Sequence, residues 1–324
     1  MKGWEELKLI QGIRARAGSA GHGVLLGIGD DTAVVKTPAG GRLLCTVDSI
    51  VDGVHFLGDL NRWDSAGRRA LGAAVSDIAA MGGVPLYVML SLFLPGGFPA
   101  RRVDRFMDGF MSRAREYGIR LIGGNIAATH GSFAADTVII GKAYRGRFVR
   151  RSGAREGDAI CIAGTTGEAM AGLDLIRLKD TRSYPVLIRR YLEPSPMLNE
   201  GTRIVDTVAP TSMIDVSDGL LQDLSHILEE SGRGARIDLD RVPVTEGVKY
   251  AARLLGKSPY AYVLTGGDDY VLLFTVPAER YRRRISGTEI YRIGEIVKRS
   301  GIAFYEYGRK VSLNLDTTGY VHQG

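Results

Sequence analysis

The sequence is poor in the residues that mark several common classes of protein. Its 324 residues include only two cysteines and five histidines, which argues against a disulfide framework, a zinc cluster and a nucleophilic triad. Cys45 and Cys161 each lie in an apolar run, so we expect two buried free thiols. No apolar stretch approaches the length of a membrane span, and the opening residues MKGWEELKLI carry no secretion signal. We therefore expect a cytoplasmic protein without a membrane partner.

A Walker A loop is also missing. No glycine-rich segment is followed by Lys-Ser or Lys-Thr, so the phosphate cradle of the P-loop enzymes is absent. The chain carries 42 Lys and Arg against 36 Asp and Glu, a net charge of +6, which suits nucleic acid or phosphorylated small molecules. The arginines are spread along the chain. The densest run, Arg282-Arg283-Arg284, is interpreted as the solvated face of a short helix, so we expect no nucleic-acid partner.

Helical and strand patterns alternate throughout, which predicts an α/β or α+β fold. A polar, basic stretch at 145–157 shows neither the helical nor the strand spacing of apolar residues, and the alternation of helix and strand patterns restarts after it. We therefore predict two domains, residues 1–147 and 148–324. The predicted strands cover residues 42–47, 86–94, 119–122, 137–144, 159–163, 211–216 and 271–276, and the predicted helices cover 64–81, 99–117, 167–178 and 219–230.

Aspartates recur at the ends of the apolar segments. Asp30 and Asp31 precede a short strand, and Asp48 is predicted at the end of another. Asp215 and Asp218 lie where a later strand passes into a helix. A single such acid is often only a cap or a turn former, but the recurrence favours a site. Oxygen ligands without soft partners suit magnesium or calcium, and dispersed single aspartates suit magnesium better, because it keeps phosphate oxygens among its ligands.

Two further positions attract attention. Asp77 shares one face of the predicted helix 64–81 with a row of alanines. An acid in such a row is exposed either on a surface without a function or at a place where another group must approach closely. The second interpretation is favoured. Ser217 can cap the helix that begins near residue 219, where free backbone N–H groups would also suit a phosphate. The alanines of the row are Ala66, Ala70, Ala73 and Ala80.

An ordered set of motifs covers nearly the whole chain. GIGDDTAVV, TVDSIVDGVHF, AAVSDIAAMGG, LIGGN, RRSGAREGDAICIAG, MIDVSDGLLQDLSHILEESG, GGDDYVLLFT and GYVH occur in this order. The set resembles the thiamine-monophosphate kinase family, in the superfamily that includes aminoimidazole ribonucleotide synthetase. The resemblance implies two α/β domains with mixed sheets, a homodimer formed through the N-terminal sheet, and conversion of thiamine monophosphate and ATP to thiamine diphosphate and ADP.

The resemblance also implies a set of site residues, carried across motif by motif. Several magnesium ions would be held by Asp30, Thr46, Asp48, Asp77, Asp215 and Asp218. ATP would contact Gly124, Asn125, Arg151 and Ser217, and the substrate would meet His55, Asp268 and Tyr320.

Elementary chemistry agrees with this assignment. Donor and acceptor are both phosphate anions, so bringing them together needs divalent cations and the carboxylates that hold them. The acceptor oxygen is already ionised, so no catalytic base is expected, and positioning carries the rate. Some positions depart from the family pattern. Asn125 replaces an aspartate, Asp268 a glutamate, Val271 a second acid, and Ala74 an asparagine, while Gln323 replaces a final aromatic residue.

Two alternatives stay open at this point. One is a sister ATP-dependent synthetase of the same superfamily with another acceptor, against which the DGVHF and SDGLLQDL segments argue. The other is a non-catalytic nucleotide- or metabolite-binding homologue, disabled by changes such as Asn125. Three single residues also have plain structural interpretations: His55 as a turn histidine, Tyr320 as a packed tail aromatic and Arg151 as a solvated linker charge.

Overall fold

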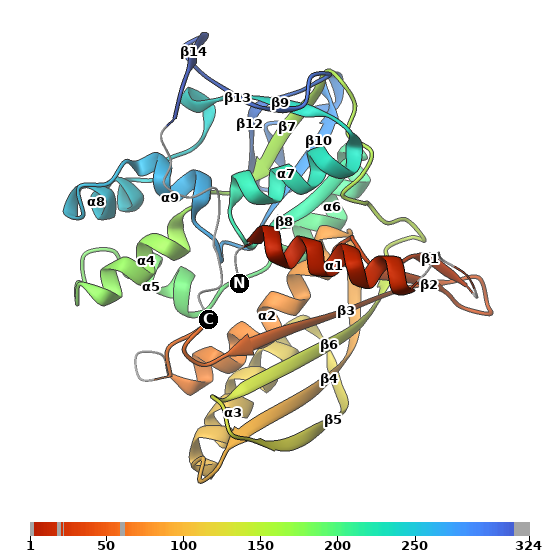
Figure 1. Ribbon diagram of the computed structural model, residues 1–324, viewed down its shortest axis with the longest axis vertical. Helices are drawn as coiled ribbons and strands as arrows, with labels where there is room; N and C mark the ends of the chain where they lie inside the picture. Colours follow the sequence, from red (N-terminus) through yellow and green to blue (C-terminus); the bar gives the residue numbers. More distant parts are fainter. Residues whose placement is uncertain (1–2, 18–20, 22, 59–61, 314–324) are drawn as a thin grey trace.

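Two mixed sheets, one in each half of the chain, form the framework of the protein (Figure 1). The computed structural model describes residues 3–17, 21, 23–58 and 62–313. Helices pack on the sheets, and the fold class is the one expected from the sequence. Within the described residues, no helix is both long and apolar enough to cross a membrane.

The N-terminal half builds a six-stranded sheet in the order β1-β2-β3-β6-β4-β5. The pair β4–β5 is parallel and the other pairs are antiparallel. Helices α2 and α3 cover one face, which the apolar stripe of α3 explains, since Phe106, Phe110 and Ala114 are all fully buried. The elements are α1 (Gly3–Ala17), β1 (Val24–Leu26), β2 (Ala33–Lys36), β3 (Arg42–Val51), α2 (Trp63–Ala80), β4 (Gly83–Pro95), α3 (Ala100–Tyr117), β5 (Arg120–Thr129) and β6 (Ala134–Ala143).

The C-terminal half builds an eight-stranded sheet in the order β14-β13-β9-β12-β7-β10-β8, with β11 paired to β12. Strands β7 and β10 and the edge strand β8 are buried on both faces, which explains their apolar runs. The elements are β7 (Asp158–Ala163), α4 (Glu168–Arg177), α5 (Pro185–Leu192), α6 (Leu198–Val208), β8 (Ser212–Val216), α7 (Leu220–Ser231), β9 (Gly234–Asp238), η1 (Leu239–Arg241), α8 (Glu246–Leu254), α9 (Pro259–Thr265), β10 (Val271–Pro277), η2 (Ala278–Arg280), β11 (Arg284–Ile285), β12 (Thr288–Val297), β13 (Gly301–Glu306) and β14 (Arg309–Val311).

Helix α2 belongs to the cores of both halves. Leu71 and Val75 pack in the core of the first sheet, whereas Ala79 and Ala80 pack with α6 and the C-terminal sheet. Small residues permit this close approach, because a Cβ on Gly201 of α6 would lie 2.3 Å from the Ala79 carbonyl oxygen. Of the predicted row of alanines, Ala80 therefore packs against the second half of the chain, whereas Ala66 and Ala70 lie in the core of the first half.

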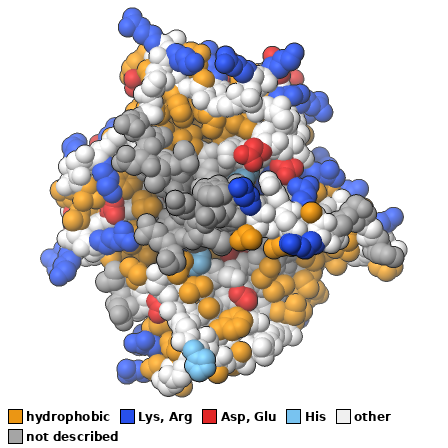
Figure 2. Space-filling model, viewed as in Figure 1, with side chains coloured by type: hydrophobic (Ala, Val, Ile, Leu, Met, Phe, Trp, Pro, Cys, Tyr) orange, Lys and Arg blue, Asp and Glu red, His pale blue; other side chains and the backbone are white. Residues whose placement is uncertain are grey.

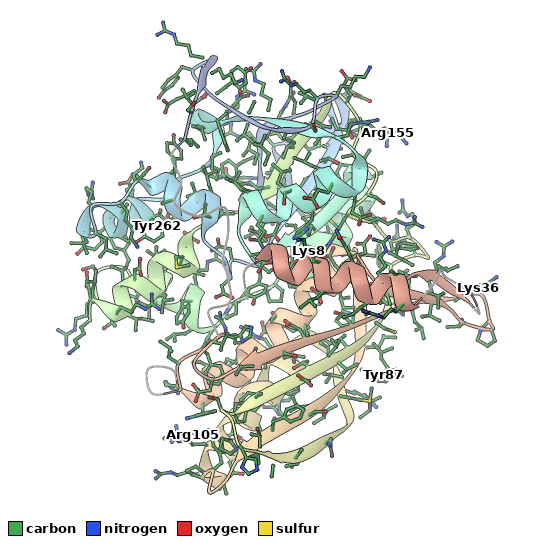
Figure 3. The ribbon with its side chains drawn as sticks, viewed as in Figure 1. Lys8, Lys36, Tyr87, Arg105, Arg155 and Tyr262 are labelled. Carbon is green, nitrogen blue, oxygen red and sulfur yellow. The ribbon has the colours of Figure 1, made fainter. Side chains whose placement is uncertain are left out.

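The other face of the first sheet is open. Val47 of β3 and Tyr87 of β4 are 62% and 43% exposed, and Ile122 and Ile126 of the edge strand β5 are exposed as well. Figure 2 shows hydrophobic side chains on the lower half of the molecule, over this sheet, and Figure 3 labels Tyr87 there. Cys45 shares the open face and is only partly buried, so the expectation of a buried thiol is right for Cys161 alone.

Several predicted boundaries need correction. Asp48 does not end its strand, because β3 continues to Val51. Gly124 and Asn125 lie inside β5, which the sequence predicts to end before them. The run Arg282-Arg283-Arg284 is not helical, since it follows η2 and enters β11.

Candidate active site

Three carboxylates from different parts of the chain meet beside α2. Asp31 precedes β2, Asp77 lies on α2 and Asp215 on β8, and each offers an oxygen within 4.8 Å of the others. The hydroxyl of Thr46 donates to Asp77 Oδ2, and Ser76 donates to Asp215 Oδ2 at 2.6 Å. Both halves of the protein therefore build this cluster.

The cluster has the electrostatics of a cation site. Burial, and then the charge of Asp31, raises the pKa of Asp215 to about 7. Burial, and then Asp215 and Asp48, raises the pKa of Asp77 well above its ordinary value. Asp31 Oδ2 is buried and has no hydrogen-bond partner among the described residues. Crowded carboxylates and an unsatisfied buried oxygen favour a divalent cation, and a donor set made only of oxygen fits magnesium.

Arg151 closes one side of the cluster. Its guanidinium donates to Asp31 Oδ1 at 2.6 and 3.1 Å, and its backbone N–H approaches both carboxylate oxygens of Asp30 at 3.2 Å. The side chain is 23% exposed, so it is not a solvated linker charge. Burial, followed by repulsion from Asp31, raises the pKa of Asp30 to about 7. The positively charged guanidinium of Arg151 thus lies beside carboxylates that would bind metal ions. This arrangement suits a phosphate group together with its metal ions.

The turn between β8 and α7 is organised by an acid that the sequence prediction missed. Asp223 Oδ2 accepts the backbone N–H groups of Ser217, Asp218 and Gly219, each at 3.1 Å. Ser217 therefore does not cap the helix, and these three N–H groups already have an acceptor. Asp218, Asp223 and His226 offer ligand atoms within 4.8 Å of one another. In the sequence, this cluster could have been recognised from Asp223 and His226, which lie three residues apart on one helix and so share a face.

The residues expected to meet the acceptor lie in two turns. In the first, the N–H of Val51 donates to His55 Nδ1 at 3.0 Å, so the ring proton of a neutral His55 is on Nε2. In the second, Asp268 pairs with Arg69 of α2. Its neighbour Asp269 accepts the N–H groups of Gly167 and Ala169 at 2.5 and 3.0 Å. Tyr320 lies outside the described residues.

Asn125 and Gly124 are set apart from the cluster. In the register of the first sheet, Asn125 pairs with Ser91 of β4, Ser91 with Asp136, and Asp136 with Ser49 of β3. Because side chains alternate along a strand, this polar row occupies the open face, opposite to Thr46 and Asp48. Gly124 has a structural reason to be glycine, since a Cβ there would lie 1.9 Å from the Leu90 carbonyl oxygen.

Known proteins share both the sequence and the fold. Two family models match the chain, AIR synthase related protein, N-terminal domain, at residues 29–143, and AIR synthase related protein, C-terminal domain, at residues 155–306. The thiamine-monophosphate kinase of Escherichia coli K12 is 36% identical over 98% of this chain and 98% of its own length. That of Aquifex aeolicus is 35% identical over 88% of this chain and 90% of its own. The chain belongs to the thiamine-monophosphate kinase family.

Solved structures of the thiamine-monophosphate kinase family agree with this membership. The structure of AaThiL complexed with AMPPCP and TMP has a TM-score of 0.85 and 32% identity, covering 98% of this chain and 97% of that one. Thiamine monophosphate kinase from Aquifex aeolicus gives a TM-score of 0.80 at 32% identity, covering 95% and 98%. A hydrogenase maturation protein, HypE, at 21% identity and a TM-score of 0.69 over 87% and 92%, shares the fold alone.

Proposed function

We propose that this protein transfers the γ-phosphoryl group of ATP to thiamine monophosphate, giving thiamine diphosphate and ADP. The observation that carries the proposal is the cluster of Asp31, Asp77 and Asp215, assembled from both domains with Arg151 beside it, in a chain of the thiamine-monophosphate kinase family. The reaction brings two phosphate anions together, and the cluster supplies the carboxylates that would hold the neutralising cations.

Magnesium fits the donor set described above. Asp31, Asp77 and Asp215 would hold it, with Thr46 fixing the Asp77 carboxylate. Asp30, Asp48 and Asp218 remain proposed ligands, and Asp48 already adds to the charge felt by Asp77 and Asp215. When bound, the metal neutralises charge on the phosphate oxygens. The protein's own part is to orient both substrates, with Arg151 proposed to bind ATP phosphates through its guanidinium.

No general base is assigned. The attacking oxygen of thiamine monophosphate belongs to an ionised phosphate, so no strongly bound proton has to be removed before it attacks. His55, Asp268 and Tyr320 are proposed to bind the acceptor, whose thiazolium ring is cationic and whose pyrimidine carries an amino group. A carboxylate such as Asp268 suits either feature.

We also propose a homodimer formed through the open face of the first sheet. Its exposed apolar side chains, Val47 and Tyr87 among them, are of the kind that a partner covers. Asn125 shares that open face, so an ATP contact from Asn125 would be supplied across the dimer. We expect a Val47→Lys variant to elute as a monomer in size-exclusion chromatography with light scattering and to lose affinity for ATP. An unchanged dimer would exclude this face.

The central experiment is to incubate the protein with ATP, magnesium and thiamine monophosphate and to measure thiamine diphosphate by chromatography. We expect product, and none with a chelator. Turnover of a different phosphorylated acceptor with no thiamine diphosphate would instead support the sister-synthetase alternative. ATP binding without turnover of any acceptor would support the non-catalytic one. A cytoplasmic location is part of the proposal, and cell fractionation tests it.

A further inference from the structure

Arg69 of α2 is a buried cation that reaches across to the C-terminal domain. It is 1% exposed and pairs with Asp268, whose side chain is 29% exposed. Its guanidinium also donates to the Tyr191 carbonyl oxygen at 2.7 Å and lies 5.1 Å from the centre of the Tyr191 ring. Burial alone would lower the pKa of Arg69, but Asp268, with Tyr270 and Tyr191, outweighs it, so the pKa rises above its ordinary value and the guanidinium keeps its charge.

The turn that carries Asp268 is held in a specific shape. Asp268 and Tyr270 both have positive φ, +69° and +52°, which few non-glycine residues adopt. Their N–H groups donate to the carbonyl oxygens of Ser217 and Val216 at 2.7 and 2.8 Å. Asp269 accepts N–H groups at the start of α4 and is buried, so of these two consecutive acids only Asp268 keeps an exposed edge.

The orientation of the Asp268 carboxylate is also set by its partners. Arg69 contacts Oδ2, and the Tyr270 hydroxyl donates to Oδ1 at 3.2 Å. Each oxygen keeps a further lone pair for a ligand. Burial, and then the charge of Asp268, raises the pKa of Tyr270 well above its ordinary value, so this hydroxyl keeps its proton for the bond to Asp268.

We propose that Arg69 is a positioning residue, which holds the Asp268 carboxylate in the orientation that meets the acceptor. The proposal rests on the proposed function. Arg69 and Asp77 lie eight residues apart on α2, about 12 Å along one rigid helix, so a single element sets both the metal carboxylate and the acceptor carboxylate. The shorter aspartate at position 268, where the family pattern has glutamate, is thereby fixed by a long, buried partner.

A double-mutant cycle tests the proposal. Arg69→Met, Asp268→Asn and the double variant are compared for the KM of thiamine monophosphate, the KM of ATP and kcat. We expect Arg69→Met to raise the KM of thiamine monophosphate on the order of ten- to a hundredfold, with the KM of ATP little changed. In the Asp268→Asn background, Arg69→Met should raise the KM of thiamine monophosphate little further. Arg69→Lys, which keeps the charge, should recover part of the loss and serves where Arg69→Met does not fold.

A matched control separates positioning from stability. Arg113 is another buried arginine that crosses between the domains, donating to the Pro194 carbonyl oxygen at 3.1 Å without contacting Asp268. Arg113→Met should lower the melting temperature and leave the KM of thiamine monophosphate unchanged. The role of Arg69 would be overturned if Arg69→Met changed the KM of thiamine monophosphate equally in the wild-type and Asp268→Asn backgrounds. It would also be overturned if Arg69→Met, like Arg113→Met, lowered only the stability. Failure of the wild-type protein to form thiamine diphosphate would instead overturn the proposed function, and this inference with it.

Discussion

The Ser76 hydroxyl of α2 donates a 2.6 Å hydrogen bond to Asp215 of β8, so one domain fixes a site carboxylate of the other. Both residues are buried, and the neighbouring Asp77 extends the same contact region. The site exists only where α2 meets the C-terminal sheet, and the predictions below test this arrangement.

Removing one cluster charge should abolish turnover and spare the fold. Asp215→Asn keeps an oxygen for the Ser76 hydroxyl and relieves repulsion with Asp31, so the metal-free melting temperature should stay equal or rise. Turnover should fall by roughly two to four orders of magnitude, because a carboxylate that holds a cation contributes several kcal/mol. Asp206→Asn, at a surface acid paired with Arg145 and Arg147, is the control and should behave as wild type. A large loss of stability with normal turnover would make Asp215 a structural residue.

The metal-free protein should lose stability as pH rises toward 7. Asp215 has its pKa raised from 3.8 to about 7 by burial, so between these values the folded protein holds a proton that the unfolded chain has released. The free energy of unfolding then falls by about 1.4 kcal/mol per pH unit for this group. Denaturant titrations from pH 4.5 to 7.5 should show the decline. Asp215→Asn should flatten it in part only, because Asp269 also has its pKa raised to about 7 by burial.

The raised pKa values of the site carboxylates also predict how magnesium affinity depends on pH. Because burial raises the pKa of Asp30 and of Asp215 to about 7, binding a cation near neutral pH should release protons, and the affinity for magnesium should increase from pH 6 to 8. Calorimetry in buffers of different ionisation enthalpy measures the release directly. Affinity independent of pH over this range would contradict the assignment.

Two adjacent glycines of β5 should respond differently to alanine. A Cβ on Gly124 would lie 1.9 Å from the Leu90 carbonyl oxygen, whereas the nearest atom to a Cβ on Gly123 is 4.0 Å away. Gly124→Ala should therefore destabilise the protein by about 1–3 kcal/mol, and Gly123→Ala should not. If Gly124→Ala has the stability of the wild type but binds ATP poorly, then Gly124 is required for nucleotide binding and not for strand pairing.

Sequence patterns predicted the helices of the N-terminal half well, because the patterns that form these helices are local. The apolar stripe of α3 and the left-handed Gly118 that ends it, with φ of +67°, are both visible in the sequence. The predicted helix 64–81 likewise matches α2 closely. The predicted domain boundary at residue 147 stays a prediction.

The missed features depend on contacts between distant segments. Ser217 has the right residue type for a cap, yet Asp223 takes that role because it folds back from the first turn of α7. Asn125 follows two glycines that suggest a turn, but pairing with β4 extends the strand through them. The pair of Arg69 and Asp268 has no local signal, since it depends on how α2 docks against the second sheet.

The dual packing of α2 also bears on how the chain acquires its structure. A polypeptide ending at residue 147 would leave Ala79 and Ala80 without the α6 surface that covers them, and one starting at 148 would lack the helix that buries Val205. Each half has a buried core of its own, but a third hydrophobic cluster is complete only when the end of α2 packs against α6 and the C-terminal sheet. A nascent chain therefore completes this shared cluster only after α6 and β8 have emerged from the ribosome.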